Sequence, residues 1–241
     1  MLLSDILAEM SEQNYSKYYD LLKQSKLLRG LSSSELDFVC EQADPWIQNF
    51  KKGTRLWSQG DFVPYIDILD KGIFISQKYH LDGRIQLICS FTRPEIINLE
   101  APASFKGTSP VFIVASSDCR VLRISYKRLI QNANIAPNIR MKIMENISAY
   151  LADDSIRYMY KSEVLSQRKV KDRVITFLNV LRHQTGNDLV DTGMSQEEFA
   201  QYLCVDRTSL SETINELRRE GIIDFRKSKF TLNFPKTGSG L

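Results

Sequence analysis

Apolar positions near the C-terminus follow the period of two short helices. Leu210, Ile214 and Leu217 stand four and three positions apart, which predicts a helix with a single buried stripe. A shorter helix precedes it, and its apolar face consists of Phe199, Ala200 and Leu203. The residues between the two helices, Cys204-Val205, are predicted to form a tight turn.

The polar positions of this segment fit the same pair of helices. Ser195 and Glu198 form an S-x-x-E capping box, in which each side chain bonds the other residue's backbone N–H. Asp206 is a good N-cap for the second helix. Polar residues point away from the stripe, mostly near the front of that helix: Arg207, Thr208, Ser211, Glu212 and Asn215. This arrangement is typical of a helix-turn-helix.

After Gly221 the pattern changes from helix to strand. Two partly alternating apolar runs, within 222–225 and 230–234, flank a basic turn that contains Lys227. They predict a β-hairpin, the wing beside such a motif. An ordinary packed helical hairpin would bury similar stripes, but the basic wing and the polar leading face favour DNA binding.

From Trp46 to Ser125 the chain consists of short apolar or alternating runs punctuated by glycine. The strand-like runs are 65–69, 73–79, 84–88, 111–115 and 121–124. Asp82-Gly83 is a strong hairpin signal. Short strands at this spacing predict a closed or sandwiched β-fold, most naturally a jelly roll, which can hold a small ligand. Residues 1–45 are expected to be largely helical, with a second capping box at Ser32 and Glu35.

A long helix is predicted to begin at Pro137. Its narrow apolar seam consists of Met144, Ile147 and Leu151, and Tyr158 and Leu165 resume the same side after polar 153–155. Packing on its own domain would also produce such a stripe, but the narrow, polar-flanked form favours a dimer seam. A further helix over 166–183 and a lead-in over 186–193 connect it to the helix-turn-helix.

The composition agrees with a soluble globular protein, since 43% of the 241 residues are hydrophobic and 25% are charged. No apolar run approaches the roughly 18 residues of a membrane span. The start of the chain, with Asp5, is unlike a secretory signal, and the four cysteines form no C-x-x-C pair. A cytoplasmic protein with reduced thiols is therefore expected. A net charge of +3 does not by itself indicate nucleic acid, so any phosphate-binding surface depends on local arrangement.

With these residues in view, the chain resembles the CRP/FNR family of bacterial transcription regulators over almost its whole length. The matching segments are 27–36 (LLRGLSSSEL), 50–54 (FKKGT), 59–61 (QGD), 70–72 (DKG) and, most specifically, 194–223. The resemblance implies a homodimeric regulator that binds a two-fold site in double-stranded DNA and contacts RNA polymerase. It also implies an unknown small-molecule effector, or none, and no enzymatic activity.

The resemblance implies the fold class as well. We expect an α+β protein with an N-terminal jelly-roll β-barrel of the cyclic-nucleotide-binding type, a long dimerisation helix and a C-terminal winged helix-turn-helix. The sensor domain with its N-terminal helices is expected over 1–136, the dimerisation helix over 137–165 and the DNA-binding domain over 166–241.

Carried over by position, Arg207, Thr208 and Glu212 stand where the family contacts base edges in the major groove. Arg207 can give a guanine two hydrogen bonds, and Glu212 can accept one from cytosine N4. The family often has glutamate at Thr208 and arginine at Glu212, so a different target sequence is expected. Phosphate contacts are expected from Ser195, Gln196, Ser209, Lys227 and Lys229, for which capping and solvation are the alternative roles. Cys204 stands where the family usually has glycine, and a left-handed turn there costs about 1–2 kcal/mol.

Cyclic-nucleotide binders of the family carry a G-E-L turn and, later, an R-S pair that holds the cyclic phosphate. The corresponding effector-pocket positions here are Asn98, Leu99 and Glu100, then Ser109 and Pro110, with Tyr158 and Met159 where the long helix would touch the base. Serine thus replaces the bidentate arginine, which removes a strong buried phosphate donor. We therefore predict no binding of cyclic AMP.

The sequence contains few residues that could support an iron–sulfur cluster or a haem as the sensor. Iron–sulfur members use an N-terminal cysteine cluster, whereas the first cysteine here is Cys40. His80 is the one candidate haem ligand in the barrel, and a lone histidine beside a hairpin turn is more often structural. No metal ligands, cofactor or catalytic residues are predicted. Two rival hypotheses stay open: a cyclic-nucleotide sensor with an altered pocket, and a ligand-binding or enzymatic barrel whose C-terminal helices mediate association.

Overall fold

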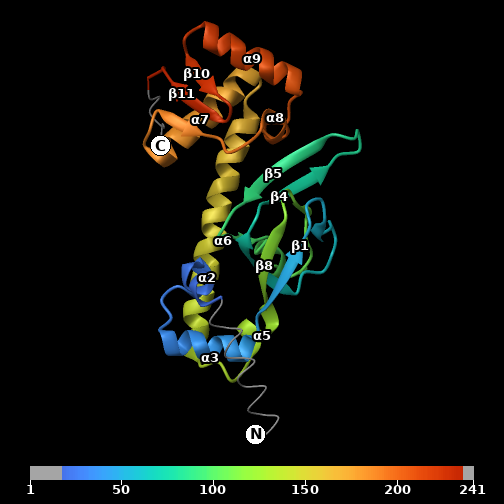
Figure 1. Cartoon of the computed structure of the whole chain (residues 1–241), viewed down its shortest axis with the longest axis vertical. Coiled ribbons are helices and arrows are strands. Elements are labelled where there is room, and N and C mark those ends of the chain that lie inside the picture. The colour runs from blue at the N-terminus through green and yellow to red at the C-terminus, as the bar shows by residue number, and fades with distance from the viewer. Residues whose placement is uncertain (1–17, 236–241) are drawn as a thin grey trace. The chain divides into compact units, whose positions relative to one another are not determined.

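The computed structural model describes residues 18–235 (Figure 1). It divides into two compact units, 18–78 with 88–153 and 79–87 with 154–235. The predicted division into three domains is not tested by this and stays a prediction. Helices expected before residue 18 lie outside the described residues. Within the described range, no helix combines the length and apolar character that crossing a membrane requires.

Two antiparallel four-stranded sheets form the first unit. One has the order β1(Trp46–Phe50), β8(Cys119–Ser125), β3(Tyr65–Lys71), β6(Ile96–Ile97), and the other β2(Arg55–Trp57), β7(Phe112–Ala115), β4(Phe74–Tyr79), β5(Ile85–Phe91). All five predicted strand segments are present. The two sheets are not joined into one closed barrel, so the jelly roll is a sandwich.

The central strands β3 and β8 are buried on both faces, although each of them also carries charged residues. On one face, Ile66 and Leu122 belong to a core shared with the helices of this unit. On the other face, Leu69 and Val121 pack with Phe74 of the second sheet. The sandwich therefore has an apolar interior and a second apolar layer under its helices.

The helices of this unit are α2(Tyr19–Gln24), the 3-10 turn η1(Lys26–Leu28), α3(Ser33–Ala43), α4(Glu100–Ala103), α5(Tyr126–Gln131) and the start of α6(Pro137–Ser166). Helices α3 and α6 begin where the sequence predicts, after Ser32 and at Pro137, whereas α4 was not predicted. The capping box of α3 is confirmed, because Glu35 N–H donates to Ser32 Oγ at 3.3 Å and Ser32 N–H to Glu35 Oε2 at 2.7 Å. Ser125 caps α5 by accepting the N–H of Arg128 at 3.3 Å.

The apolar seam predicted on α6 is largely an internal face of the sandwich unit. Ile147 is 3% exposed and packs with Ile139 and Ile143 in the core. Leu151 packs against the same core, and Met144 is 37% exposed. The expectation that Ile147 lies at a dimer seam is therefore wrong, because the apolar outer face of the sheet needs a helix to cover it. The exposed apolar side chains of α6 are instead Met141, Met144, Ile156, Met159 and Tyr160.

The second unit is a small helical domain with a three-stranded sheet. Its elements are the end of α6, α7(Val170–Thr185), β9(Leu189–Asp191), α8(Gln196–Leu203), α9(Arg207–Arg219), β10(Ile223–Arg226) and β11(Lys229–Leu232). The wing hairpin is confirmed, and its sheet has the order β10-β11-β9. The pattern analysis missed β9, in which Val190 is buried opposite Phe230. The core of this unit joins α7, α8, α9 and the wing.

Candidate nucleic-acid interface and effector pocket

The first helix of the helix-turn-helix begins at the predicted capping box. Glu198 N–H donates to Ser195 Oγ at 3.2 Å, and Ser195 N–H donates to Glu198 Oε2 at 2.8 Å. Ser195 Oγ also donates to that carboxylate at 2.7 Å. Capping therefore occupies the Ser195 side chain, while the N–H groups of the first turn at Gln196 and Glu197 have no partner within the helix. Those N–H groups are suited to a phosphate oxygen.

The turn between the helices adopts the left-handed conformation for which glycine is suited. Cys204 has φ 56° and ψ 47°. Its N–H bonds the carbonyls of Ala200 and Gln201, so helix α8 ends within a single residue. Cysteine at this position stores about 1–2 kcal/mol of backbone strain relative to a right-handed residue. The turn predicted from the family resemblance is thus present despite the substitution.

Helix α9 buries its predicted stripe and exposes its predicted leading face. Leu210, Ile214 and Leu217 are at most 1% exposed. Arg207 and Thr208 are the first two residues of the helix and are exposed, as is Glu212 one turn later. Asp206 occupies the N-cap position, but its side chain makes no capping hydrogen bond, which corrects the sequence interpretation. The side chain of Ser209 is half-buried.

The wing and the start of α8 meet at a common cleft of about 470 Å³. Its lining residues are Asp191, Gly193, Met194, Ser195, Gln196, Phe225, Lys227 and Ser228. Three predicted phosphate contacts, Ser195, Gln196 and Lys227, are therefore brought together, from segments more than 30 positions apart. Ser209 and Lys229 are not among the lining residues, although Lys229 stands opposite Asp191 in the paired strands β11 and β9.

Asp191 is a component of this cleft that sequence patterns did not indicate. The N–H of Gly193 donates to its Oδ1 at 2.9 Å. That bond, followed by a bond from the Ser228 side chain, lowers the pKa of Asp191 below its ordinary value. Asp191 therefore remains ionised and restricts the positions at which a phosphate can approach Lys227.

Two other basic residues of this unit, Arg218 and Lys171, have intramolecular partners. Arg218 Nε lies 3.0 Å from Asp224 Oδ1, with both side chains more than half exposed. Lys171 Nζ bonds Glu220 at 2.6 Å and Glu216 at 3.4 Å. Arg218 is therefore part of a solvated face. The exposed cations at the front of the motif are then Arg207 and those of the wing.

In the sandwich unit, Asn98 and Ser109 lie together and are almost fully buried. Asn98 Nδ2 donates to Ser109 Oγ at 3.1 Å, and Ser109 Oγ donates to the carbonyl of Val111 at 2.8 Å. The two residues are 1% and 2% exposed. In the described part of the chain, no charged side chain bonds either residue, and Asn98 Oδ1 has no hydrogen-bond partner. The positions that would hold a cyclic phosphate are instead linked by a neutral hydrogen bond.

The other predicted pocket residues lie in different environments. Leu99 is fully buried in the core, Glu100 begins α4, and Pro110 is exposed. Tyr158 and Met159 lie on the part of α6 that belongs to the second unit, where Met159 is 68% exposed. The hydrogen bond between Asn98 and Ser109 is therefore the feature of these positions on which the effector argument rests.

A buried ion pair inside the sandwich also escaped the sequence analysis. Arg123 Nε donates to Asp67 Oδ1 at 2.7 Å, and Arg123 Nη1 donates to Gln48 Oε1 at 2.7 Å. Trp57 Nε1 donates to Asp67 Oδ2 at 2.7 Å. The guanidinium lies 4.8 Å from the ring centroids of both Trp57 and Tyr65. Alternating strand positions suggested only apolar interiors, and no local signal marks this pair.

Comparison with known proteins agrees with this architecture. The Crp-like helix-turn-helix domain family matches residues 172–236, and the cyclic nucleotide-binding domain family matches residues 47–134. No curated protein sequence matches the chain. No group of three or more His, Cys, Asp or Glu side chains in the described part of the chain could hold a metal ion.

Several solved structures share the fold at low sequence identity. The c-di-GMP responsive global regulator CLP of Xanthomonas campestris is 17% identical, with a TM-score of 0.66, over 85% of this chain and 100% of that one. FixK2 of Bradyrhizobium japonicum is 17% identical, with a TM-score of 0.58, over 79% and 93%. A CooA mutant of Carboxydothermus hydrogenoformans is 14% identical, with a TM-score of 0.60, over 87% and 95%. The predicted fold class is thereby confirmed.

Proposed function

Because the chain belongs to the CRP/FNR family of DNA-binding transcription regulators, we propose that it acts as a homodimer on a two-fold site in double-stranded DNA. Helix α9 would enter the major groove, with the wing and the start of α8 on the phosphate backbone. The observation that carries this proposal is the cleft in which Gln196 and Lys227 meet, beside a second helix whose leading residues are exposed.

Base recognition is assigned to Arg207, Thr208 and Glu212. Arg207 is at the first helical position with its side chain exposed, so it can present two donors to guanine O6 and N7. Glu212 is exposed on the next turn and can accept from cytosine N4, whereas it repels phosphates. A site that contains G·C pairs at both positions satisfies these two side chains together.

Phosphate contacts are assigned to the start of α8 and to the wing. The unbonded N–H groups of the first turn of α8 and the ammonium group of Lys227 supply donors around one cleft. Lys229 adds charge on the adjacent strand. Ser209 and Ser195 are weaker candidates, because the first is half-buried and the second is engaged in its capping box.

Dimerisation is assigned to the exposed apolar side chains of α6. Met141 is 62% exposed and Met159 is 68% exposed, and a second copy of the chain packed along α6 would remove their apolar area from water. The seam proposed here differs from the one expected from the sequence, since Ile147 is in the core. RNA polymerase is the proposed protein partner and the cytoplasm the proposed site of action, both by family membership.

The sensor domain is proposed to respond to an effector other than cyclic AMP, or to none. A cyclic phosphate bound beside Asn98 and Ser109 would lack the arginine that neutralises it, and the Ser109 hydroxyl already bonds Val111. An effector must bind two conformations with different affinity in order to shift the position of α9. Calorimetry with cyclic AMP, cyclic GMP and c-di-GMP tests this proposal. Saturable binding of cyclic AMP contradicts it, and binding of cyclic GMP or c-di-GMP favours the rival hypothesis of an altered nucleotide sensor.

The DNA-binding proposal is tested by fluorescence anisotropy on a duplex selected from a random pool by the wild-type protein. Arg207→Ala is expected to weaken binding to this duplex by about 1–3 kcal/mol, or roughly 5- to 150-fold, and to relax preference at one base pair. Arg219→Ala, at the last position of α9, is the matched control and should change affinity little. Equal affinity of the wild type and Arg207→Ala, with unchanged base preference, would remove Arg207 from recognition.

A further inference from the structure

The sandwich unit carries a basic cleft at the ends of strands β1 and β3 and at the start of β8. We call it the strand-end cleft. Its volume is about 320 Å³, and its lining residues are Asn49, Phe50, Lys51, Lys71, Asp118, Cys119 and Arg120. Three cations and one carboxylate thus surround a single depression in a chain whose total net charge is only +3.

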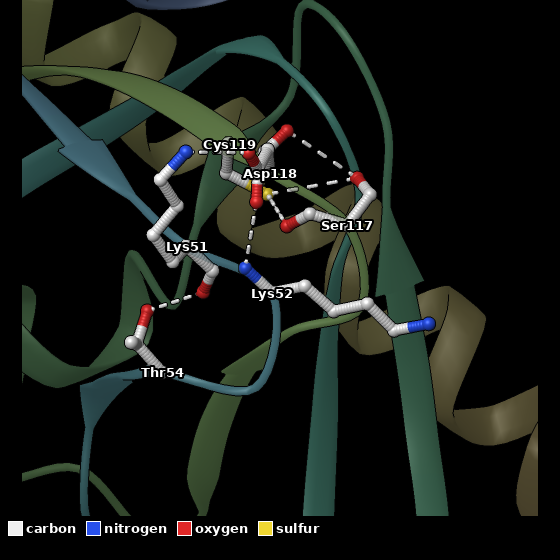
Figure 2. A network of polar contacts seen from close by, with 6 residues as sticks. All are labelled: Lys51, Lys52, Thr54, Ser117, Asp118 and Cys119. Atoms are coloured by element: carbon white, nitrogen blue, oxygen red, sulfur yellow. Dashed lines mark hydrogen bonds and ion pairs between the residues drawn. The ribbon is translucent and has the colours of Figure 1, made fainter.

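A hydrogen-bonded loop holds the one carboxylate of this cleft in place. Asp118 Oδ1 accepts the backbone N–H of Lys52 at 3.0 Å, and Asp118 Oδ2 accepts from Lys51 Nζ at 2.9 Å. Figure 2 shows the Lys51 side chain turned toward Asp118, while the Lys52 side chain extends away from it. These two contacts lower the pKa of Asp118, that of the Lys52 N–H being the larger, so the carboxylate is ionised at neutral pH. Asp118 therefore acts as a fixed internal counter-ion.

The cations of the cleft retain capacity to bind an external anion. Lys51 and Asp118 are 85% and 63% exposed, and an ion pair at such exposure contributes little and exchanges readily. Within residues 18–235, the side chain of Lys71 makes no hydrogen bond or ion pair, and the residue is exposed. Arg120 uses Nε for Asp70, a side chain only 8% exposed, and this pair orients its guanidinium. Its two terminal nitrogens make no hydrogen bond within the same range.

We propose that the strand-end cleft binds a phosphate-bearing anion through Lys51, Lys71 and Arg120. An arginine oriented by a buried carboxylate offers paired N–H donors that match phosphate oxygens, and two flexible lysines add charge. The volume is within the range of small-ligand sites. The site shares no residue with the Asn98–Ser109 pair or with the helix-turn-helix, and only its nucleic-acid source rests on the proposed function. The phosphate belongs either to a small molecule or to nucleic acid.

The small-molecule source is tested by calorimetry with inorganic tripolyphosphate at low ionic strength, in a buffer without phosphate. The test variant is Lys51→Gln/Lys71→Gln, in which both altered side chains are exposed and the Asp70–Arg120 pair is kept. The matched control is Lys106→Gln/Lys127→Gln, which removes the same number of charges from two exposed positions of the sandwich unit that do not line the cleft. The cleft variant is expected to bind at least about tenfold more weakly than the wild type, and the control variant within about twofold of it.

A gain of affinity provides a second readout that a merely structural cluster would not give. Asp118→Asn keeps an oxygen to accept the Lys52 N–H but removes the internal counter-ion and releases Lys51. It is expected to bind tripolyphosphate about five- to tenfold more tightly, because the anion no longer competes with a fixed carboxylate. Unchanged or weaker binding by Asp118→Asn would contradict the electrostatic mechanism.

The nucleic-acid source is tested by the salt dependence of DNA binding. The logarithm of the DNA-binding constant falls linearly with the logarithm of the salt concentration. If a DNA phosphate occupies the cleft, Lys51→Gln/Lys71→Gln makes this negative slope shallower by about 0.9 for each phosphate that the variant no longer neutralises. If a small molecule occupies it, that slope is unchanged and only tripolyphosphate binding weakens. The proposal is overturned if the variant changes neither quantity, or if the wild type binds no tripolyphosphate and has the same slope as the variant.

Discussion

The buried pair of Asp67 and Arg123 allows the sharpest test of how the sandwich is stabilised. Asp67 is fully buried and Arg123 is 7% exposed, so neither charge can regain water when its partner is removed. Asp67→Ala leaves the guanidinium with Gln48 and two aromatic rings, and removes the acceptor of Trp57 Nε1. The expected loss of unfolding free energy is about 3–5 kcal/mol, the typical penalty for one unpaired buried charge.

Removing the other partner should have a smaller effect that depends on pH. Burial raises the pKa of Asp67, while the charge of Arg123 and then its hydrogen bond lower it. In Arg123→Met, Arg123 no longer lowers the pKa of Asp67, so the Asp67 carboxylate can take up a proton and become neutral. A carboxyl whose pKa is raised in the folded state stabilises at low pH, and that contribution is lost as pH rises through the folded pKa. The stability deficit of Arg123→Met relative to wild type should therefore grow as pH rises above the folded pKa of Asp67 in the wild type, which itself lies above the ordinary value of 3.8.

The double variant Asp67→Ala/Arg123→Met completes the cycle. With both charges gone, it should be at least about 2 kcal/mol more stable than the sum of the two single losses predicts. Urea unfolding followed by tryptophan fluorescence measures this, because both tryptophans, Trp46 and Trp57, are in the sandwich unit. Losses that add to within about 0.5 kcal/mol would refute the interpretation that the pair is energetically coupled.

Three further substitutions test the core, the turn and the dimer. Ile147→Ala should lower the unfolding free energy by about 2–5 kcal/mol, because it opens a cavity in the core. Met144 is exposed on the same helix, so Met144→Ala should lower it by much less. Equal losses of the two variants in urea unfolding would contradict the burial of Ile147. Cys204→Gly should relieve the left-handed backbone strain at the turn and raise the unfolding free energy of the second unit by up to about 1 kcal/mol, after the entropy cost of glycine is subtracted. Hydrogen exchange of the backbone amides of α8 and α9 measures this change. Faster exchange of these amides in the variant would refute the strain argument. Met159→Glu should shift the protein toward monomer in light scattering, and an unchanged dimer mass would exclude this face of α6 from the interface.

At the effector pocket, the family resemblance identified residues of interest but not the contact between them. Matching the family's pattern indicated that serine replaces arginine at position 109 and asparagine replaces glycine at position 98. The hydrogen bond between Asn98 and Ser109 was not predicted, because the two residues are 11 positions apart and are joined only through the folding of α4 and its loop. Both residues were thus identified from the sequence, and their contact was not.

Features whose partners are near in sequence were determined by the sequence itself. The capping boxes at Ser32 and Ser195 each connect residues three positions apart, and the stripe of α9 repeats within three turns. Such interactions depend on helix geometry alone, so the residue types and their spacing suffice to predict them. The same holds for the wing hairpin, whose strands are adjacent along the chain.

The tertiary structure decided the features that join distant residues. Arg123 and Asp67 are 56 positions apart, and β9 pairs with β11 across the whole helix-turn-helix. Ile147 is internal because a sheet assembled from four separate segments presents an apolar face that α6 must cover. An apolar stripe on a helix indicates that one face of the helix is buried. The stripe does not indicate whether a sheet of the same chain or a second chain covers that face, because either one removes the same apolar area from solvent.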